Sequence, residues 1–232
     1  MNRSGENLIR VELHVHTKAS FDSLMPIDKL IQRCQTLGID RVAITDHNVI
    51  DAALEAKKNA PELVIVGEEI ETTKGELIGY FMSEWVPPGL DPKETIERLT
   101  AQGAVISVPH PFDVVRSKHW EEVDLETLVP LLDAIEVFNA RCTSDMPNRQ
   151  AGAFARKHGL LENVGSDAHT LGEIGMATLR MAEFDDAESF KDALRGAQPD
   201  TRLSPVFVHL FSTYAKIVKR INLSQSENKA SH

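Results

Sequence analysis

Apolar residues recur along the chain in two alternating patterns. Short continuous runs rich in valine and isoleucine are typical of buried strands, whereas apolar positions three and four residues apart are typical of helices. The strand-like runs lie at residues 9–14, 41–45, 63–66, 76–81, 104–108 and 134–138 and just before Gly165. Helix-like segments separate most of these runs, so the pattern predicts an α/β fold of about seven strands in βα units around a parallel sheet.

Helix start and stop signals support this division. Pro26 and Gly38 bound a helix whose apolar face includes Cys34, which is therefore expected to be a core residue. Asp91 before Pro92 has the pattern of an N-cap and a first helical residue, and the helix that follows should end at Gly103. Further helices are expected at residues 49–60, at residues 146–158, and from a cap at Asp185 to near Gly196.

The end of the chain has a different pattern. From Ser204 onward, apolar residues recur at helical spacing, at Val206, Leu210, Tyr214, Ile217 and Val218. We therefore expect a barrel domain at residues 1–203 and, at 204–232, an amphipathic helix that docks on it and ends in a disordered tail. A small basic cluster after the apolar positions leaves open the alternative that this helix lies on a membrane surface.

Composition narrows the function classes. The chain has 232 residues and a formal net charge of −10, so it lacks the basic field expected of a protein that tracks along long nucleic acid. Cys34 and Cys142 are too few for a disulfide framework. The chain shows neither the pattern of a signal peptide nor an apolar run long enough to span a membrane, so a cytoplasmic location is expected.

Residue types that bind metals come directly after the predicted strands. They are His14 and His16, Asp46 and His47, Glu68 and Glu69, His110, Asn139 and Cys142, and Asp167 and His169. In a βα barrel, the loops after the strands converge on one face, where active sites are built. Imidazole together with carboxylate suits Zn, Mn or Fe. The remaining histidines His119, His158 and His209 lie away from strand ends, and surface or packing roles are expected for them.

Spacing within the pairs adds detail. Residues i and i+2 at a strand end point the same way, so His14 with His16, and Asp167 with His169, could each chelate one ion. Glu69 has two carboxylate oxygens and could bridge two ions, as two-metal hydrolytic sites require.

Four ordered motifs resemble those of the polymerase and histidinol phosphatase (PHP) superfamily over about residues 10–200. They read E-L-H-V-H-T-K-A-S-F-D, I-T-D-H-N, V-P-H-P-F and G-S-D-A-H. Between them, V-G-E-E-I-E-T-T-K-G-E-L-I-G is similar to the family's glutamate segment and implies that Glu69 is the bridging ligand. The resemblance implies a stand-alone phosphoesterase with a distorted (β/α)7 TIM-like barrel and two or three divalent metal ions.

The resemblance also implies how the ligands divide among the ions. The first ion would take His14, His16, Glu69 and Asp167, the second Glu69 and His110, and the third Asp22, His47 and His169. One position departs from the family pattern, because Glu76 stands where many members have a histidine. Glu76 could ligate in its place, or the second site could be weaker; Cys142 is a further open candidate.

The expected reaction is hydrolysis of a phosphate ester by a metal-activated hydroxide. The substrate would be a small phosphomonoester, a nucleotide or a cyclic phosphate. Arg116, Arg141 and Asn139 are placed to bind it, and His47 or His169 could donate the proton to the leaving group, with Asp167 counted among the catalytic residues. The alternatives are a 3'-5' exonuclease on short nucleic-acid ends, a non-catalytic metal-binding barrel and hydrolysis of a C–N bond.

Overall fold

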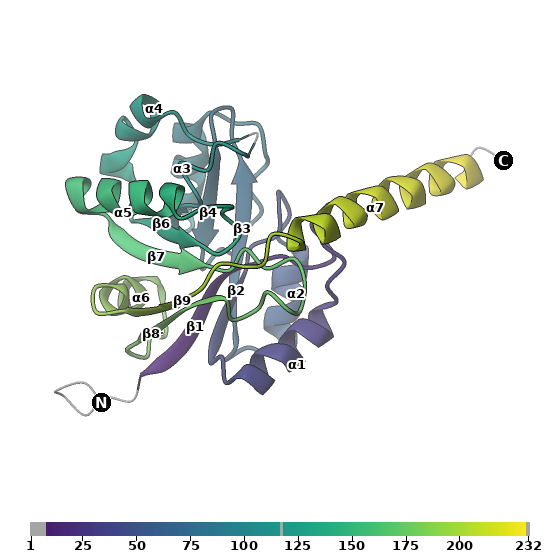
Figure 1. Cartoon of the computed structure of the whole chain (residues 1–232), viewed down its shortest axis with the longest axis horizontal. Helices are drawn as coiled ribbons and strands as arrows, with labels where there is room; N and C mark the ends of the chain where they lie inside the picture. The colour runs from purple at the N-terminus through teal and green to yellow at the C-terminus, as the bar shows by residue number, and fades with distance from the viewer. Residues whose placement is uncertain (1–7, 117, 231–232) are drawn as a thin grey trace.

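In the described part of the chain, nine strands form one sheet, most of which curves into a nearly closed barrel (Figure 1). The computed structural model describes residues 8–116 and 118–230. The strands are β1 (Ile9–Val15), β2 (Arg41–Ile44), β3 (Val64–Glu71), β4 (Glu76–Tyr80), β5 (Val105–Val108), β6 (Ala134–Asn139), β7 (Leu161–Gly165), β8 (Ala177–Met181) and β9 (Gln198–Thr201). Their order in the sheet is β7-β6-β5-β4-β3-β2-β1-β8-β9, so the predicted α/β class and barrel architecture are confirmed.

The barrel closes between β1 and β7 only at one end. The backbone N–H of His16 donates to the carbonyl of Ala168 at 2.9 Å, and the N–H of Ala168 donates to the carbonyl of His14 at 3.2 Å. These contacts lie at the carboxyl ends of both strands, because Ala168 follows β7. The closure therefore brings the predicted ligand pair of β1 next to the predicted pair after β7.

The expected parallel sheet is interrupted by antiparallel pairs, at β8 and β9 and also at β4. This strand pairs antiparallel with both β3 and β5. Only residues 72–75 connect β3 to β4, and a parallel crossover needs a dozen or more residues. As a result β4 starts, at Glu76, at the same end of the barrel where β3 finishes.

Helices connect the strands and cover the outside of the barrel. They are α1 (Ile27–Leu37), α2 (Asp51–Asn59), α3 (Pro92–Ala101), α4 (Glu122–Glu126), α5 (Met146–His158) and α6 (Ala187–Leu194), and a short 3-10 helix lies at Val129–Leu131. Gly38 ends α1 with a left-handed backbone at φ 64°, and Cys34 is fully buried on the inner face of that helix, as expected. Asp186, one residue later than predicted, caps α6 by accepting a hydrogen bond from the N–H of Ser189.

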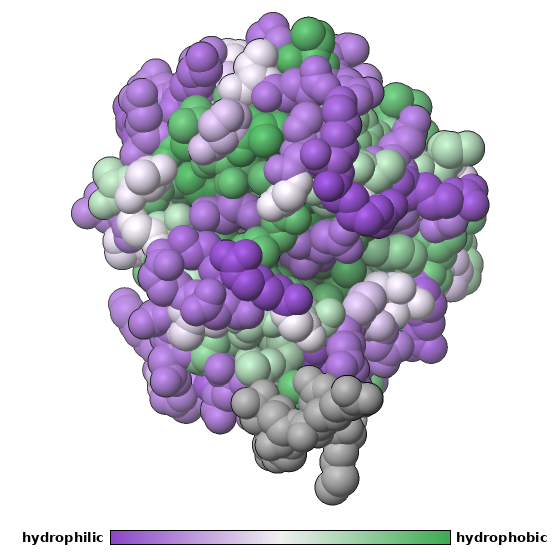
Figure 2. All heavy atoms as spheres, turned by 90° about the vertical axis from the view of Figure 1, so that its left-hand side faces the viewer, coloured by the Kyte–Doolittle hydropathy of each residue, from purple (hydrophilic) through white to green (hydrophobic). Residues whose placement is uncertain are grey.

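Sequence patterns did not predict β8, β9 and α4. The β9 sequence, Gln198–Thr201, has no large apolar residue and lies at the edge of the sheet, so it lacks the buried alternation that marks a strand. The face in Figure 2 mixes hydrophilic and hydrophobic residues, as expected for the surface of a chain with net charge −10.

The last helix, α7 (Val208–Ala230), begins against the barrel and then runs away from it (Figure 1). It docks through Val208, Ser212 and Ala215, which are buried. The predicted docking residues Leu210 and Tyr214 are instead 70% and 60% exposed, and Val206 and Ile217 are exposed as well. Most of the predicted docking residues are therefore exposed, and α7 contacts the barrel through a different side, where Ser212 accepts a hydrogen bond from Arg141.

The backbone of α7 is helical as far as Ala230, into the polar end for which the sequence suggests disorder. Residues 231–232 lie outside the described part of the chain. Within the described ranges, no helix has a stretch both long and apolar enough to cross a lipid bilayer.

Candidate metal centre

The residues predicted as metal ligands gather at one end of the barrel. They are His14, His16, Asp22, His47, Glu69, His110, Asp167 and His169, and each side chain is at most 8% exposed. Among the described residues, all of these except Asp22, together with Glu76, form overlapping groups whose donor atoms lie within 4.8 Å of one another. The groups are His14, His16 and Glu69; His14, His110 and Asp167; His16, His47 and His169; and His47, Glu69 and Glu76.

Glu69 lies at the centre of the cluster. Its Oε2 is 3.1 Å from His47 Nδ1, 3.2 Å from His14 Nε2 and 3.3 Å from His16 Nε2. Its Oε1 is 2.9 Å from His110 Nε2. Because successive side chains of a strand point to opposite faces, the preceding residue Glu68 points elsewhere and accepts a hydrogen bond from the N–H of Val86 at 3.1 Å.

Asp22 joins the cluster through the loop between β1 and α1. Its Oδ1 is 3.2 Å from His169 Nε2, and its Oδ2 is 3.7 Å from His47 Nε2. Asp46 holds this loop in place, since its carboxylate accepts hydrogen bonds from Thr17 and Ser20, with Oγ1 of Thr17 at 2.6 Å. Asp46 therefore positions the loop, while the next residue, His47, faces the cluster.

Glu136 on β6 supports the cluster and was not identified from the sequence. Its Oε1 is 3.0 Å from His14 Nδ1, and its Oε2 accepts from the backbone N–H of His110 at 2.9 Å and from Asn139 Nδ2 at 2.8 Å. A carboxylate on the outer nitrogen of a metal-binding histidine fixes its ring orientation. The available signal was an acid in the middle of an otherwise buried strand.

Glu76 lies at the edge of the cluster, and Cys142 lies apart from it. The Glu76 carboxylate is 3.8 Å from His110 Nε2 and 3.9 Å from His47 Nδ1. The Sγ of Cys142 is 3.8 Å from Asp113 Oδ2, and the ligand groups found among the described residues do not include this thiol. Glu76 thus lies close enough to His47 and Glu69 to share a ligand group with them.

Two of the three predicted substrate-binding residues touch the cluster. Arg116 donates to Asp167 through Nη2 and to Asp113 through Nε, and Asn139 Nδ2 donates to Asp167 at 3.3 Å. Arg141 lies one layer further out, where Nη2 donates to Ser212 Oγ at 2.8 Å and Nε lies 3.4 Å from Glu173.

Arg116 and Arg141 line a cavity of about 500 Å³ above the cluster. His209, for which a surface or packing role was expected, also lines this cavity. His158 packs on Phe154 with ring centroids 4.3 Å apart, and His119 lies near Arg116, bonded to its carbonyl.

Burial and neighbouring charges shift the pKa values of several side chains in the cluster. Burial opposes ionisation of Glu69 and Asp167, but the surrounding histidines and, for Asp167, Arg116 hold the pKa of both carboxyls well below the ordinary range. Burial disfavours the charged form of His14, yet Glu69, Asp167 and Glu136 raise its pKa well above the usual value. For His16, burial and the neighbouring His169 and His47 together lower the pKa.

Two predicted ligands have an unusual backbone conformation. His110 and Asp167 have φ angles of 28° and 53°, in the left-handed region that non-glycine residues rarely adopt. Such conformations persist where surrounding structure enforces them, and they concentrate at functional sites.

Glu68 provides a test of the register of β3. Burial raises the pKa of its carboxyl to about 8, so between the unfolded value of 4.5 and about 8 the folded protein keeps a proton that the unfolded chain has lost. The contribution of the Glu68 carboxyl to the free energy of unfolding is therefore greatest at low pH and decreases as pH rises through that range. Glu68→Gln cannot ionise and still offers an acceptor to Val86.

We expect metal-free Glu68→Gln to gain stability relative to the wild type between about pH 5 and about pH 8, in thermal unfolding of both proteins. Other titrating groups affect both proteins alike. A stability difference that does not change with pH would contradict the burial of an ionisable group at this position.

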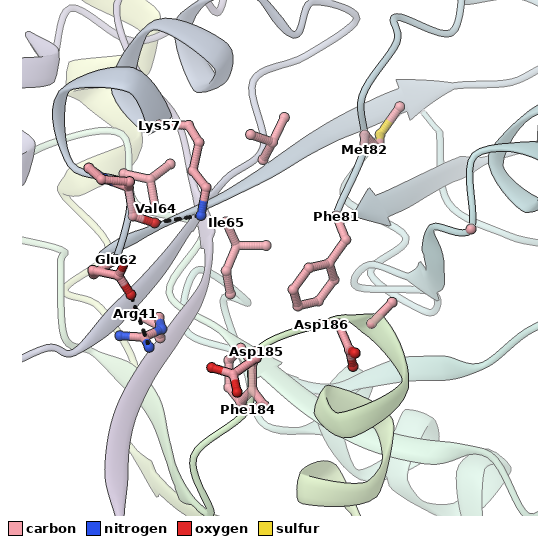
Figure 3. Close-up of a pocket in the computed structure, with 14 residues that line it drawn as sticks. Arg41, Lys57, Glu62, Val64, Ile65, Phe81, Met82, Phe184, Asp185 and Asp186 are labelled. Carbon is pink, nitrogen blue, oxygen red and sulfur yellow. Dashed lines mark hydrogen bonds and ion pairs between the residues drawn. The ribbon is translucent and has the colours of Figure 1, made fainter.

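A second cavity, of about 680 Å³, lies at the opposite end of the barrel (Figure 3). Phe81 and Phe184 line it, and Lys57 and Arg41 stand at its edge. Lys57 Nζ donates to the Pro61 carbonyl at 2.5 Å. None of the histidine and acid groups found among the described residues includes a residue of this cavity, so it is separate from the candidate metal centre.

Most of the barrel is similar in sequence to a known protein family. The PHP domain family matches residues 12–195. An uncharacterized protein of Methanocaldococcus jannaschii, MJ0417, is 37% identical over 178 residues, which cover 75% of this chain and 71% of that protein. A PolC-type DNA polymerase III of Clostridium perfringens is 46% identical over 55 residues, which cover 22% of this chain and 4% of the polymerase.

A solved structure shares the fold. It is a two-domain protein from Bacteroides vulgatus described as containing a predicted PHP-like metal-dependent phosphoesterase. It matches with a TM-score of 0.70 and 19% identity, over 85% of this chain and 66% of that one. The family match covers most of the barrel and all the residues of the cluster, so the chain belongs to the PHP domain family.

Proposed function

We propose that the chain is a metal-dependent phosphoesterase that hydrolyses a small phosphate ester. The observation that carries the proposal is the position of Glu69 among His14, His16, His47 and His110, with Arg116 beside the same cluster. One carboxylate shared by several imidazoles is the arrangement that binds neighbouring divalent ions. An arginine next to it can hold phosphate oxygens.

The donor set fits divalent metal ions. Imidazole nitrogens and carboxylate oxygens suit Mn, Fe or Zn. His16 Nε2 and Asp167 Oδ1 are buried 3.2 Å apart, and both lack a hydrogen-bond partner among the described residues, as does Asp22 Oδ1. Buried polar atoms are rarely left in this state, and bound cations would satisfy these atoms.

Bound ions would lower the pKa of a coordinated water and offset the charge of the phosphoryl group. The protein supplies the remaining functions. Arg116 and Asn139 are placed beside Asp167, where they can orient phosphate oxygens. His47 and His169 line the cavity and could transfer a proton to the leaving alkoxide. Arg141 supports this wall by holding Ser212 and Glu173.

A cavity of about 500 Å³ is in the range that accommodates small-molecule ligands, which supports a small phosphorylated substrate. The polymerase relative leaves nuclease activity as the main alternative, but the net charge of −10 opposes binding to long nucleic acid.

The proposal predicts metal-dependent turnover. Protein expressed with added Mn, Fe or Zn should carry at least two equivalents of metal, measured by elemental analysis. It should hydrolyse 4-nitrophenyl phosphate, its bis ester or members of a nucleotide panel, and a chelator should remove both metal and activity. Protein with a full metal content that hydrolyses none of these compounds would contradict the proposal, as would activity that survives complete removal of metal.

A further inference from the structure

Helix α7 forms one wall of the cavity above the cluster. Its residues His209, Ser212, Thr213 and Lys216 line the cavity together with residues of the barrel. The family match ends at residue 195, so α7 lies beyond the matched domain. Its contribution to the cavity is therefore a feature of this chain that the family match does not cover.

Polar contacts on both sides of the cavity hold α7 in place. On one side, Arg141 Nη2 donates to Ser212 Oγ at 2.8 Å, and the N–H of Ser204 donates to the carbonyl of Ala140 at 2.7 Å. On the other side, Lys219 Nζ donates to the carbonyls of Lys18, at 2.6 Å, and Ser20. The helix thus spans from the loop after β6 to the loop after β1.

Most cations that line the cavity already have close partners. Arg116 is bonded to Asp167 and Asp113. Arg141 is bonded to Ser212. Lys118 lies 2.8 Å from Glu71.

Lys216 differs from these cations. Its Nζ forms an ion pair with Asp22 Oδ2 at 3.8 Å. That separation is beyond hydrogen-bond distance. Its side chain is 43% exposed, and Nζ lies 5.1 Å from the centre of the Phe21 ring. Because Asp22 also faces His47 and His169, its charge is shared among several groups, and the Lys216 ammonium keeps donors for a ligand in the cavity.

Lys216 and Arg116 approach the cluster from different sides. Arg116 contacts Asp167, whereas Lys216 and the half-exposed Phe21 lie beside Asp22 and His47. A phosphoryl group held next to Arg116 would leave the Lys216 side for the alcohol part of the ester. Phe21, with its ring centre 5.0 Å from that of His47, adds an apolar surface there.

We propose that Lys216 binds a second anionic group, a carboxylate or a phosphate, on the alcohol part of the substrate. The inference rests on the proposed phosphoesterase function and narrows its substrate class to phosphate esters with two separated negative groups. A lysine ammonium paired with an anion in a partly enclosed cavity forms a charge-assisted hydrogen bond. Lys216 is thus a determinant of specificity, and the reacting phosphate remains with Arg116 and the cluster.

The test compares wild type with Lys216→Gln, and uses Arg220→Gln as a control that removes a charge from an exposed position of the same helix. Each metal-loaded protein is assayed with 4-nitrophenyl phosphate, 4-carboxyphenyl phosphate and 1,4-phenylene bisphosphate. We expect Lys216→Gln to raise KM for the two substrates with a second anionic group by about 10-fold, the effect of losing one charge-assisted hydrogen bond. The effect on 4-nitrophenyl phosphate, which has no second anionic group, should be clearly smaller, and Arg220→Gln should match the wild type throughout.

Equal losses on all three substrates would overturn the inference, because Lys216 would then act on the reacting phosphate; unchanged kinetics would overturn it as well. The two second groups, carboxylate and phosphate, are distinguished by which substrate the wild type prefers.

If the wild type hydrolyses no ester, the proposed function fails, and a binding experiment still tests the role of Lys216. In that case 4-carboxyphenylphosphonate should raise the Tm more than phenylphosphonate in the wild type, and Lys216→Gln should lose this difference; an unchanged difference contradicts the inference.

Discussion

Glu69→Gln is expected to lose metal and activity together, with a fall in kcat/KM of roughly 100-fold or more, since even partners outside the ligand shell cost about 10–100-fold. The carboxylate of Glu69 lies within 3.3 Å of nitrogens of His14, His16 and His47 and 2.9 Å from His110. A neutral amide in its place removes a negative charge and one of two acceptor oxygens from the centre of the cluster. Its NH2 group would also face imidazole nitrogens that are needed as ligands.

Glu68→Gln is the matched control, because the same chemical change is made one residue earlier on the same strand. Glu68 accepts from the Val86 N–H on the opposite face, and a glutamine can keep that bond. Metal content by elemental analysis and kcat/KM should therefore remain close to wild type. If Glu68→Gln loses metal while Glu69→Gln retains it, the assignment of the bridging residue is wrong.

Gly165→Ala is expected to damage the site through packing alone. A Cβ at this position would lie 2.0 Å from Glu136 Oε1 and 2.5 Å from the Cβ of His14. Both neighbours are buried and bonded to each other, so neither can move without turning the His14 ring. Overpacking of a buried site costs about 1–3 kcal/mol, and we expect a loss of unfolding free energy of that size together with weaker metal binding.

Gly172→Ala is the control for the added methyl group. The nearest atom to a Cβ there is Thr170 Oγ1 at 3.9 Å, an ordinary contact. Thermal unfolding and metal titration of both variants would separate the effects. Equal stability and equal metal affinity of the two proteins would show that the contact between Glu136 and His14 tolerates displacement.

Much of the barrel and the composition of the cluster could be predicted because two simple regularities coincide. Buried strands carry continuous apolar runs, and functional residues follow them at the carboxyl ends, so His14, His47 and Asp167 are visible as polar residues in phase with the strands. The ordered motifs then indicated which of two adjacent acids, Glu68 or Glu69, faces inward. The structure places Glu69 among the histidines.

Other features depend on tertiary contacts that leave weak traces in sequence. The direction of β4 follows from the length of one connection, which strand periodicity does not report. Glu136 is a buried acid whose purpose is apparent only once His14 lies 3.0 Å away. The orientation of α7 is set by Arg141 and the polar surface around it, whereas an apolar stripe such as Leu210 and Tyr214 predicts docking through the opposite face.

The left-handed backbone at His110 and Asp167 sets the stability of the barrel against the chemistry of the cluster. Glycine would relieve the strain at either position, since it alone adopts such angles without steric cost, but it would remove a side chain of the cluster. Selection for thermal stability alone would therefore favour glycine or asparagine at these two sites. Histidine at position 110 and aspartate at position 167 therefore supply side chains to the cluster at a cost in backbone strain, which lowers the stability of the barrel.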